Sequence, residues 1–202
     1  MTVIGLTGSS GAGKSLVASI LTKKGLPVID ADAIYHEILA SGGACTDELV
    51  DAFGKEILDP RGLVDRHALA SAVFGKPQTE LLLHTLNDIT HKYVMREIEK
   101  TLQTLQRNGT RFAVLDAPLL FEANADLLCD LVIGVVAREE AREARIVCRD
   151  GITTDEAQKR LRAQKSDEFY RSRCDHIIEN DTDQATLEKN VFALLEKIGV
   201  KL

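Results

Sequence analysis

The chain has 202 residues and a mass of 22.1 kDa, which suits one compact domain or one core with an inserted subdomain. Hydrophobic residues make up 45% of the chain and charged residues 28%, a balance that excludes an intrinsically disordered protein. The net charge of −6 and an aromatic content of 4% argue against a general binder of nucleic acids or anionic membranes.

The four cysteines are far apart in the chain and form no Cys-x-x-Cys pair. This spacing predicts reduced thiols in a reducing compartment rather than disulfides or a zinc site. No charged side chain precedes Lys14 and no cleavage site of the usual type follows the N-terminus, so no signal peptide is predicted. The apolar run over 131–137 is too short to span a bilayer. We therefore expect a cytoplasmic protein with no membrane segment.

Short apolar runs alternate with amphipathic segments along the chain. A helix is predicted over 15–24. Strands are predicted at 3–6, 26–29, 112–115, 131–136 and 176–178. Uninterrupted runs of Val, Ile and Leu are typical of strands that are covered on both faces. The alternation predicts the α/β class, as a three-layer sandwich around a five-stranded parallel sheet with right-handed crossovers.

About eighty residues separate the second predicted strand from the third, whereas a crossover between parallel strands needs about a dozen. Helical patterns at 66–74 and 78–106 fall in this interval and predict an inserted helical subdomain over 33–111. A second long interval, 138–174, is also helical and is rich in arginine. The core is then expected to comprise residues 1–32, 112–137 and 175–202.

Residues 8–15 read Gly-Ser-Ser-Gly-Ala-Gly-Lys-Ser, which matches the phosphate-binding loop (P-loop) pattern G-x-x-x-x-G-K-[ST] between a strand and a helix. Glycines let successive backbone N–H groups converge on an anion, and the helix N-terminus adds a favourable dipole. We expect Lys14 to be exposed and to reach the phosphates, and the Ser15 hydroxyl to ligate Mg²⁺. The alternative is a glycine-rich turn with an exposed lysine. The predicted nucleotide contacts are Gly8, Gly11, Ala12, Gly13, Lys14, Ser15 and Leu16.

Aspartates follow two of the predicted strands, and the carboxyl ends of parallel strands face the ligand crevice of an open sheet. Asp32 can accept a proton from a substrate hydroxyl or hold Mg²⁺ through water. Its alternative role is to cap the next helix, for which Asp30 is the better candidate. Asp116 ends the third strand, where an aspartate often orients metal-bound water, and its alternative role is that of a turn residue.

Eight of the thirteen arginines lie between residues 138 and 173. Arg142, Arg145 and Arg149 are spaced three and four apart and share one face of a helix. Such a row can clamp phosphate oxygens, which predicts a lid over 138–174 that stays mobile until phosphates offset the repulsion among the guanidiniums. The alternative is a solvated face on which nearby carboxylates pair with the arginines.

Several segments follow one another in a specific order: Ile4-Gly-Leu-Thr-Gly8, Gly25-Leu-Pro-Val-Ile-Asp-Ala-Asp32, Gly62-Leu-Val-Asp-Arg66, Pro118-Leu-Leu-Phe-Glu122 and Asp175-His-Ile-Ile-Glu-Asn180. Together they resemble the dephospho-CoA kinase family over nearly the whole chain. The Asp-Ala-Asp and Pro-Leu-Leu-Phe-Glu elements are far more specific than the P-loop. The resemblance implies a P-loop kinase core with a CoA-binding helical insert and a mobile lid.

The resemblance also implies an activity, the Mg²⁺-dependent transfer of the ATP γ-phosphate to the ribose 3′-hydroxyl of dephospho-CoA, the last step of coenzyme A biosynthesis. It implies that Asp32 is the catalytic base and that Arg145 and Arg149 act with Lys14 on the phosphates. Arg142 is expected to bind nucleotide beside them. The residues expected toward the acceptor are Asp32, Arg66, His91, Pro118, Leu119 and Glu122. No nucleic acid, membrane or obligatory protein partner is implied.

The chain departs from the family pattern at three places. The P-loop interior reads Ser-Ser-Gly-Ala where the family commonly has Gly-Ile-Gly-Ser, with little effect expected because backbone N–H groups do the binding. Lys92 follows His91 where the family usually has proline, so proline does not fix the turn beside that histidine. Arg142 stands where the family often has glutamine.

Two other functions remain as alternatives. One is another small-molecule P-loop kinase, such as a nucleoside or nucleotide kinase. The other is a nucleotide-binding regulatory or scaffold protein that hydrolyses little nucleotide. The second alternative would need neither a carboxylate beside the phosphates nor a cluster of lid arginines, and this chain has candidates for both.

Overall fold

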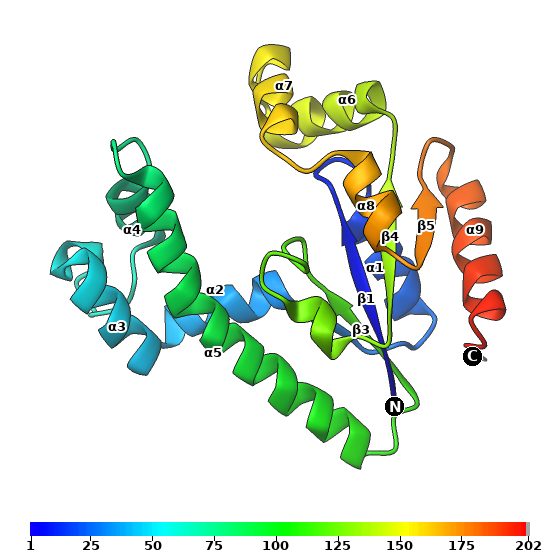
Figure 1. Cartoon of the computed structure of the whole chain (residues 1–202), viewed down its shortest axis with the longest axis horizontal. Helices are drawn as coiled ribbons and strands as arrows, with labels where there is room; N and C mark the ends of the chain where they lie inside the picture. Colours follow the sequence, from blue (N-terminus) through cyan, green and yellow to red (C-terminus); the bar gives the residue numbers. More distant parts are fainter. Residues whose placement is uncertain (201–202) are drawn as a thin grey trace. The chain divides into compact units, whose positions relative to one another are not determined.

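A computed structural model describes residues 1–200 and divides the chain into two compact units. The first unit comprises Met1–Ile29 together with the chain from Leu105 onward, and the second comprises Asp30–Thr104. Figure 1 follows the chain through both. Among the described residues, no helix combines the length and apolar character needed to cross a bilayer.

The first unit is built on a five-stranded sheet of order β2-β3-β1-β4-β5, which confirms the predicted strand number and the α/β class. Its central strand pairs in parallel with both neighbours, with Ile4 opposite Val114 on one side and Leu131 on the other. The strands are β1 (Thr2–Gly8), β2 (Val28–Asp30), β3 (Phe112–Asp116), β4 (Leu131–Val136) and β5 (His176–Glu179). Each predicted strand is therefore present to within a few residues.

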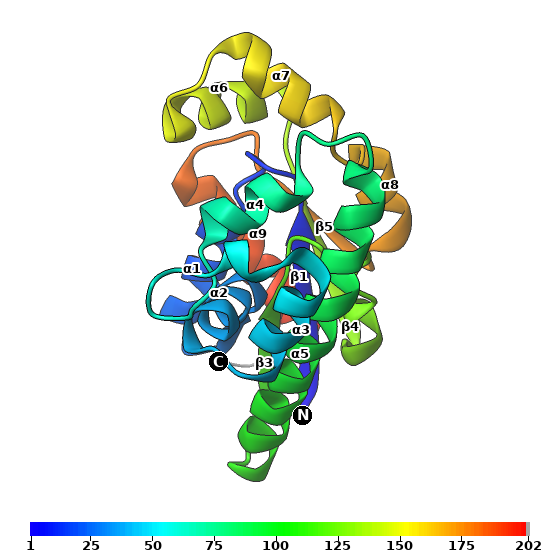
Figure 2. The same cartoon turned by 90° about the vertical axis from the view of Figure 1, so that its left-hand side faces the viewer.

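Helices cover both faces of this sheet because its central strands are apolar throughout. Ile4, Leu6 and Val114 are fully buried, so neither face of the sheet can be left to water. Figure 2 shows α1 (Lys14–Lys23) and α9 (Gln184–Lys197) on one side of the sheet and α8 (Asp167–Arg173) on the other. This arrangement gives the three layers expected of an open α/β sandwich.

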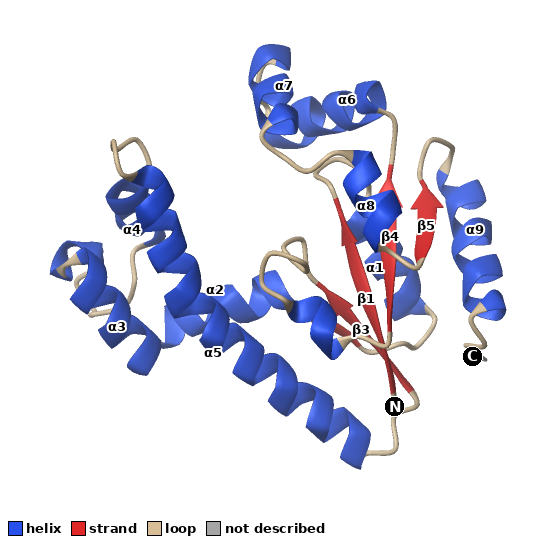
Figure 3. Ribbon diagram, viewed as in Figure 1, coloured by secondary structure: helices blue, strands red, loops and turns tan. Residues whose placement is uncertain are grey.

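The carboxyl end of the sheet carries the segments that bear most of the predicted phosphate-binding residues. The arrowheads of β1, β4 and β5 in Figure 3 point toward α6 (Glu139–Asp150) and α7 (Thr154–Arg162). These two helices pack on each other through Ile146, Ala157 and Leu161. Since the P-loop also follows the carboxyl end of β1, the loop and α6 lie at the same end of the sheet.

The second unit is helical and has a hydrophobic core of its own, which includes the buried residues Leu39, Leu49, Leu69 and Leu86. The segments predicted as helices at 66–74 and 78–106 are confirmed to within one residue at each end. Short 3-10 turns η1 (Lys55–Ile57) and η2 (Ala125–Leu128) lie in the second and first units. The remaining helices are α2 (Ala31–Ser41), α3 (Ala44–Phe53), α4 (Arg66–Val73) and α5 (Thr79–Arg107), the last of which continues into the first unit.

Candidate active site

The P-loop connects β1 to α1 through glycines whose backbone conformation excludes other residues. Gly11 and Gly13 have φ angles of +77° and +95°, and a Cβ on Gly11 would lie 2.6 Å from the carbonyl oxygen of Arg142. Gly13 is the N-cap of α1 and supplies no side-chain hydrogen bond to the helix. The first N–H groups of α1 are therefore left for a ligand, as an anion site at a helix N-terminus requires.

Lys14 and Asp116 form an ion pair at the start of α1 and the end of β3. The lysine side chain is 14% exposed and the aspartate side chain 8%, so the expectation that Lys14 is exposed was wrong. A mostly buried ammonium needs a partner, and Asp116 meets that need. The pair places both predicted phosphate-site side chains next to each other.

Two serines of the loop carry hydroxyls that suit a bound nucleotide and metal. The Ser9 hydroxyl is buried without a hydrogen-bond partner among residues 1–200, an orphaned polar atom beside the expected phosphate position. Ser15 is exposed in the first turn of α1. Its hydroxyl and the Asp116 carboxylate are the hard oxygen donors that Mg²⁺ prefers. The described residues contain no cluster of three or more His, Cys, Asp or Glu side chains that could hold a metal ion.

The arginines of α6 contact the P-loop itself. Arg142 is buried, and its Nε donates a hydrogen bond of 3.2 Å to the carbonyl oxygen of Ser10. Arg145 donates from its two terminal nitrogens to the carbonyl oxygens of Gly11, at 3.1 Å, and Asn180, at 2.8 Å. The helix is therefore tied to the loop by side-chain donors on loop carbonyls.

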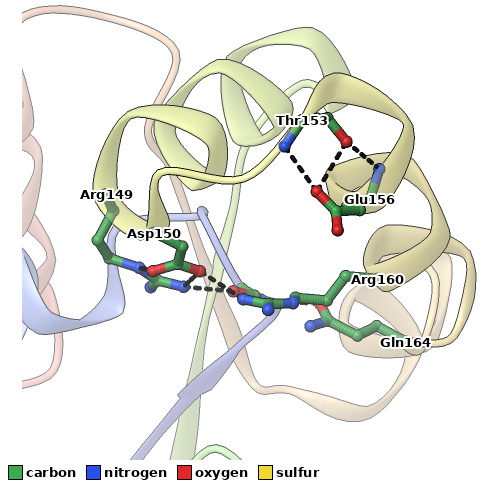
Figure 4. Close-up of polar contacts among 7 residues, drawn as sticks. Arg149, Asp150, Thr153, Glu156, Arg160 and Gln164 are labelled. Carbon is green, nitrogen blue, oxygen red and sulfur yellow. Dashed lines mark hydrogen bonds and ion pairs between the residues drawn. The ribbon is translucent and has the colours of Figure 1, made fainter.

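Arg149 is more exposed and pairs with a carboxylate on its own helix. Its guanidinium donates to Asp150 at 2.7 Å and 2.9 Å and to the Ser10 hydroxyl at 3.3 Å. Arg160 of α7 pairs with the same carboxylate, as Figure 4 shows. The hydrogen bond from Arg149 lowers the pKa of Asp150 and raises that of Arg149. Arg149 and Arg160 share the Asp150 carboxylate, which offsets the repulsion between these two guanidiniums.

The Pro118–Glu122 loop is anchored to the sheet and to α8. The Thr7 hydroxyl donates to the carbonyl oxygen of Pro118 at 3.3 Å. Leu120 is fully buried, whereas Leu119 is 49% exposed and Glu122 lies at the surface. Phe121 packs edge-to-face on Phe169, and Arg173 of α8 lies over both rings. The loop therefore presents Leu119 and Glu122 from a fixed backbone.

Asp30, the last residue of β2, and Asp32 have separate roles within the second unit. Asp30 caps α2, because its carboxylate accepts a hydrogen bond of 3.0 Å from the N–H of Ala33. This confirms Asp30 as the cap and leaves Asp32, exposed in the first turn of α2, without that duty. Asp32 is therefore available for chemistry.

Arg66 and Asp32 lie within electrostatic reach of one tyrosine. Burial raises the pKa of the Tyr35 hydroxyl, the positive charge of Arg66 lowers it, and the negative charge of Asp32 raises it. Arg66 itself is the exposed first residue of α4, whose N-cap is Asp65. Two of the predicted acceptor-side residues therefore act electrostatically on Tyr35, for which no role was predicted from the sequence.

His91 lies half-buried on α5, beside a residue with a defined partner. Lys92 forms an ion pair with Glu48 of α3, and the Tyr93 hydroxyl donates to the same carboxylate at 2.6 Å. The lysine that stands in place of the family's proline therefore joins α5 to α3. In this way a side-chain contact fixes the segment that carries His91.

Three side chains that hold the site had no role predicted from the sequence. Gln164 accepts a hydrogen bond of 2.9 Å from the Ser10 N–H, and Asp167 pairs with Arg142 at 2.9 Å. Asn180 is buried and donates from its side-chain amide to the carbonyl oxygen of Ala12 at 2.8 Å. Asn180 carried a usable signal, since it is a polar residue directly after a strand. No local pattern predicted the contacts of Gln164 and Asp167, because these contacts depend on how the segment after α7 and the start of α8 pack.

Known proteins resemble this chain over nearly its whole length. The family model for dephospho-CoA kinase matches residues 2–186. The dephospho-CoA kinase of Carboxydothermus hydrogenoformans is 38% identical over 195 residues, which cover 96% of this chain and 93% of that protein. Among solved structures, TT1252 from Thermus thermophilus is 32% identical with a TM-score of 0.80, and the two chains are covered to 98% and 97%. The dephospho-CoA kinase from Campylobacter jejuni is 27% identical with a TM-score of 0.72, at coverages of 97% and 96%. The chain belongs to the dephospho-CoA kinase family.

Proposed function

We propose that this protein transfers the γ-phosphate of ATP to the ribose 3′-hydroxyl of dephospho-CoA, giving coenzyme A and ADP. Membership of the dephospho-CoA kinase family over residues 2–186 is the observation that carries this function. The P-loop, the Lys14–Asp116 pair and the arginines of α6 supply the parts that phosphoryl transfer needs. The family disfavours both alternatives, another small-molecule kinase and a non-catalytic nucleotide-binding protein.

The phosphates are held by the loop and by positive side chains around it. Lys14 exchanges Asp116 for phosphate oxygens, and Arg145 and Arg149 stabilise the charge that develops during transfer. Ser15 and Asp116 are the residues that would hold Mg²⁺, directly or through water, and the ion would neutralise charge on the phosphate oxygens. The proposed backbone and side-chain contacts to the nucleotide are Gly8, Gly11, Ala12, Gly13, Lys14, Ser15 and Leu16.

Asp32 accepts the proton of the ribose hydroxyl. A hydroxyl is a poor nucleophile near neutral pH, so a positioned carboxylate helps by orienting it and taking its proton late in the transfer. Support comes from the cap of α2, which uses Asp30 and leaves the Asp32 carboxylate exposed. The residues proposed to bind the rest of dephospho-CoA are Arg66, His91, Pro118, Leu119 and Glu122.

This activity needs one small-molecule acceptor and no nucleic acid, membrane or obligatory protein partner. We place the enzyme in the cytoplasm, where reduced cysteines are the rule. All four cysteines are free thiols, which is consistent with that compartment.

An ADP-release assay with and without dephospho-CoA tests the function. We expect ADP to form at a rate that depends on dephospho-CoA, and to form little when a nucleoside or a nucleoside monophosphate replaces it. Release that is independent of dephospho-CoA, or that is greater with a nucleotide acceptor, would assign the chain to one of the alternative functions.

A further inference from the structure

Three consecutive carbonyl groups of the P-loop accept hydrogen bonds from side chains that come much later in the chain. The carbonyl of Ser10 accepts from Arg142 at 3.2 Å, and that of Gly11 accepts from Arg145 at 3.1 Å. The carbonyl of Ala12 accepts from the Asn180 side chain at 2.8 Å. Each peptide group from residue 10 to residue 13 thus accepts a side-chain hydrogen bond at its carbonyl oxygen.

These hydrogen bonds to the carbonyls also orient the N–H groups of the loop. A trans peptide is planar, and its C=O and the following N–H point in opposite directions. The three hydrogen bonds therefore turn the N–H groups of Gly11, Ala12 and Gly13 away from the side chains that donate to the carbonyls. The N–H of Ala12 is used within the loop, where it donates to the Ser9 carbonyl at 3.1 Å. Those of Gly11 and Gly13 make no hydrogen bond to another residue of 1–200, so they are left to donate to a phosphate.

Arg142 is bound to the protein through both ends of its guanidinium. Only 6% of the residue is exposed, its Nε is used on Ser10, and its Nη1 pairs with Asp167 of α8 at 2.9 Å. A buried guanidinium with a carboxylate partner has its charge neutralised locally. This geometry suits a residue that holds the loop better than one that contacts phosphate.

Asn180, like Arg142, is held by several hydrogen bonds to the protein. Its N–H donates to the Val136 carbonyl at 2.9 Å, and its own carbonyl accepts from Arg145 at 2.8 Å. Its side-chain amide faces the loop so closely that a Cβ on Gly13 would collide with it. The Asn180 side chain therefore has one orientation, with its amide on the Ala12 carbonyl.

We propose that Arg142, with Asp167 as its counter-ion, and Asn180 are positioning residues that orient the P-loop N–H groups for the phosphates of the nucleotide. They act through the carbonyls of Ser10 and Ala12 and do not touch the phosphates. The inference rests on the proposed function only for the identity of the ligand, a nucleoside triphosphate.

Direct ATP binding tests this, measured by isothermal titration calorimetry on the full chain. The variants are Arg142→Met, which keeps the apolar stem and removes all donors, Asp167→Asn and Asn180→Ala. We expect the affinity for ATP and for ADP to fall about 10-fold or more in Arg142→Met and Asn180→Ala, the usual effect of losing a charge-assisted or buried hydrogen bond. The affinity for dephospho-CoA should not change. Asp167→Asn should lower ATP affinity less than these two variants do. Asp167→Glu, which keeps the negative charge, should lower it less than Asp167→Asn.

The matched control is Arg171→Met, since Arg171 also lies on α8 and pairs with an exposed carboxylate, Glu179, at 2.9 Å without reaching the loop. It should leave ATP affinity unchanged, and an equal loss there would overturn the inference. Full ATP affinity in folded Arg142→Met and Asn180→Ala would overturn it as well. If Arg142→Met does not fold, the ATP affinities of Asp167→Asn and Asn180→Ala decide instead, and full affinity in both would overturn the inference.

A double-variant cycle separates the role of the counter-ion. If Asp167 acts through Arg142, the double variant Arg142→Met with Asp167→Asn should bind ATP no more weakly than Arg142→Met alone. If the losses of ATP affinity in the two single variants add up in the double variant, Asp167 does not act through Arg142. Because binding needs no turnover, intact ATP binding with no dephospho-CoA-dependent ADP release would contradict the proposed function and leave this inference standing.

Discussion

The two units of the chain present their candidate residues in opposite ways. In the first unit the P-loop is enclosed by side-chain contacts from distant segments, and Lys14, Arg142 and Asn180 all have protein partners. In the second unit Asp32 and Arg66 lie exposed in the first turns of their helices. Under the proposed function, phosphate binding depends on a framework that orients backbone N–H groups, whereas the acceptor is bound by separate, exposed side chains.

The exposed aspartate of the second unit gives the largest expected effect. Asp32→Asn keeps the size and one acceptor oxygen but removes the base, so we expect kcat to fall by roughly 10²–10⁴-fold, the usual range for a general base. Directly measured binding of ATP and dephospho-CoA should change little.

Asp30→Ala is the matched control on the same turn. It removes the cap of α2 and should lower the free energy of unfolding by about 1 kcal/mol while leaving kcat nearly unchanged. Near-normal turnover in Asp32→Asn would reject the base, and rescue of that variant by excess Mg²⁺ would reassign the residue to metal binding.

The buried lysine of the first unit gives the next largest effect. Lys14→Met removes a positive charge that acts on the transferring phosphate, so kcat should fall by about 10²–10³-fold. Lys23→Met changes an exposed lysine at the far end of the same helix and serves as the control. Steady-state assays on both folded variants provide the test, and equal kcat values would remove Lys14 from the chemistry.

The cysteine thiols give the smallest expected effect, a dependence of stability on pH in both units. Burial raises the pKa of Cys45 in the second unit to about 11, and those of Cys129 and Cys174 in the first to about 12 and about 11, from an ordinary value of 9.0. Since the folded pKa values are raised, their contribution to stability is fully present below the unfolded value. It is lost as the pH rises through about 11 for Cys45 and Cys174 and through about 12 for Cys129.

Thiol labelling followed by mass spectrometry measures this. Near neutral pH the exposed Cys148 should react about 10-fold faster or more than the buried Cys45 and the half-buried Cys129 and Cys174, because access and the thiolate form govern the reaction. Labelling of Cys45 well before Cys129 and Cys174 would show that the second unit opens on its own. Equal labelling of all four would contradict the burial of these thiols.

The sequence predicted what depends on local pattern. Strands and long helices were found because uninterrupted Val, Ile and Leu runs and helical periodicity are local properties. Asp30 was identified as a cap for the same reason, since the cap bond spans three residues.

What the sequence did not reveal depends on distant packing. The exposure of Lys14 was misjudged because its partner, Asp116, is about a hundred residues away and meets it only through the strand order β3-β1. No role was predicted for Gln164 or Asp167, because Gln164 meets the Ser10 N–H and Asp167 meets Arg142 only once the distant segments are packed.

The most direct test of the proposed activity is to identify the phosphorylated product. The enzyme is incubated with Mg²⁺, ATP and dephospho-CoA, and the acceptor is examined by ³¹P NMR and mass spectrometry. The proposed activity predicts one new phosphomonoester on the ribose 3′-hydroxyl, formed in equal amount to ADP. ADP without a phosphorylated acceptor, or phosphate on a different hydroxyl, would contradict it.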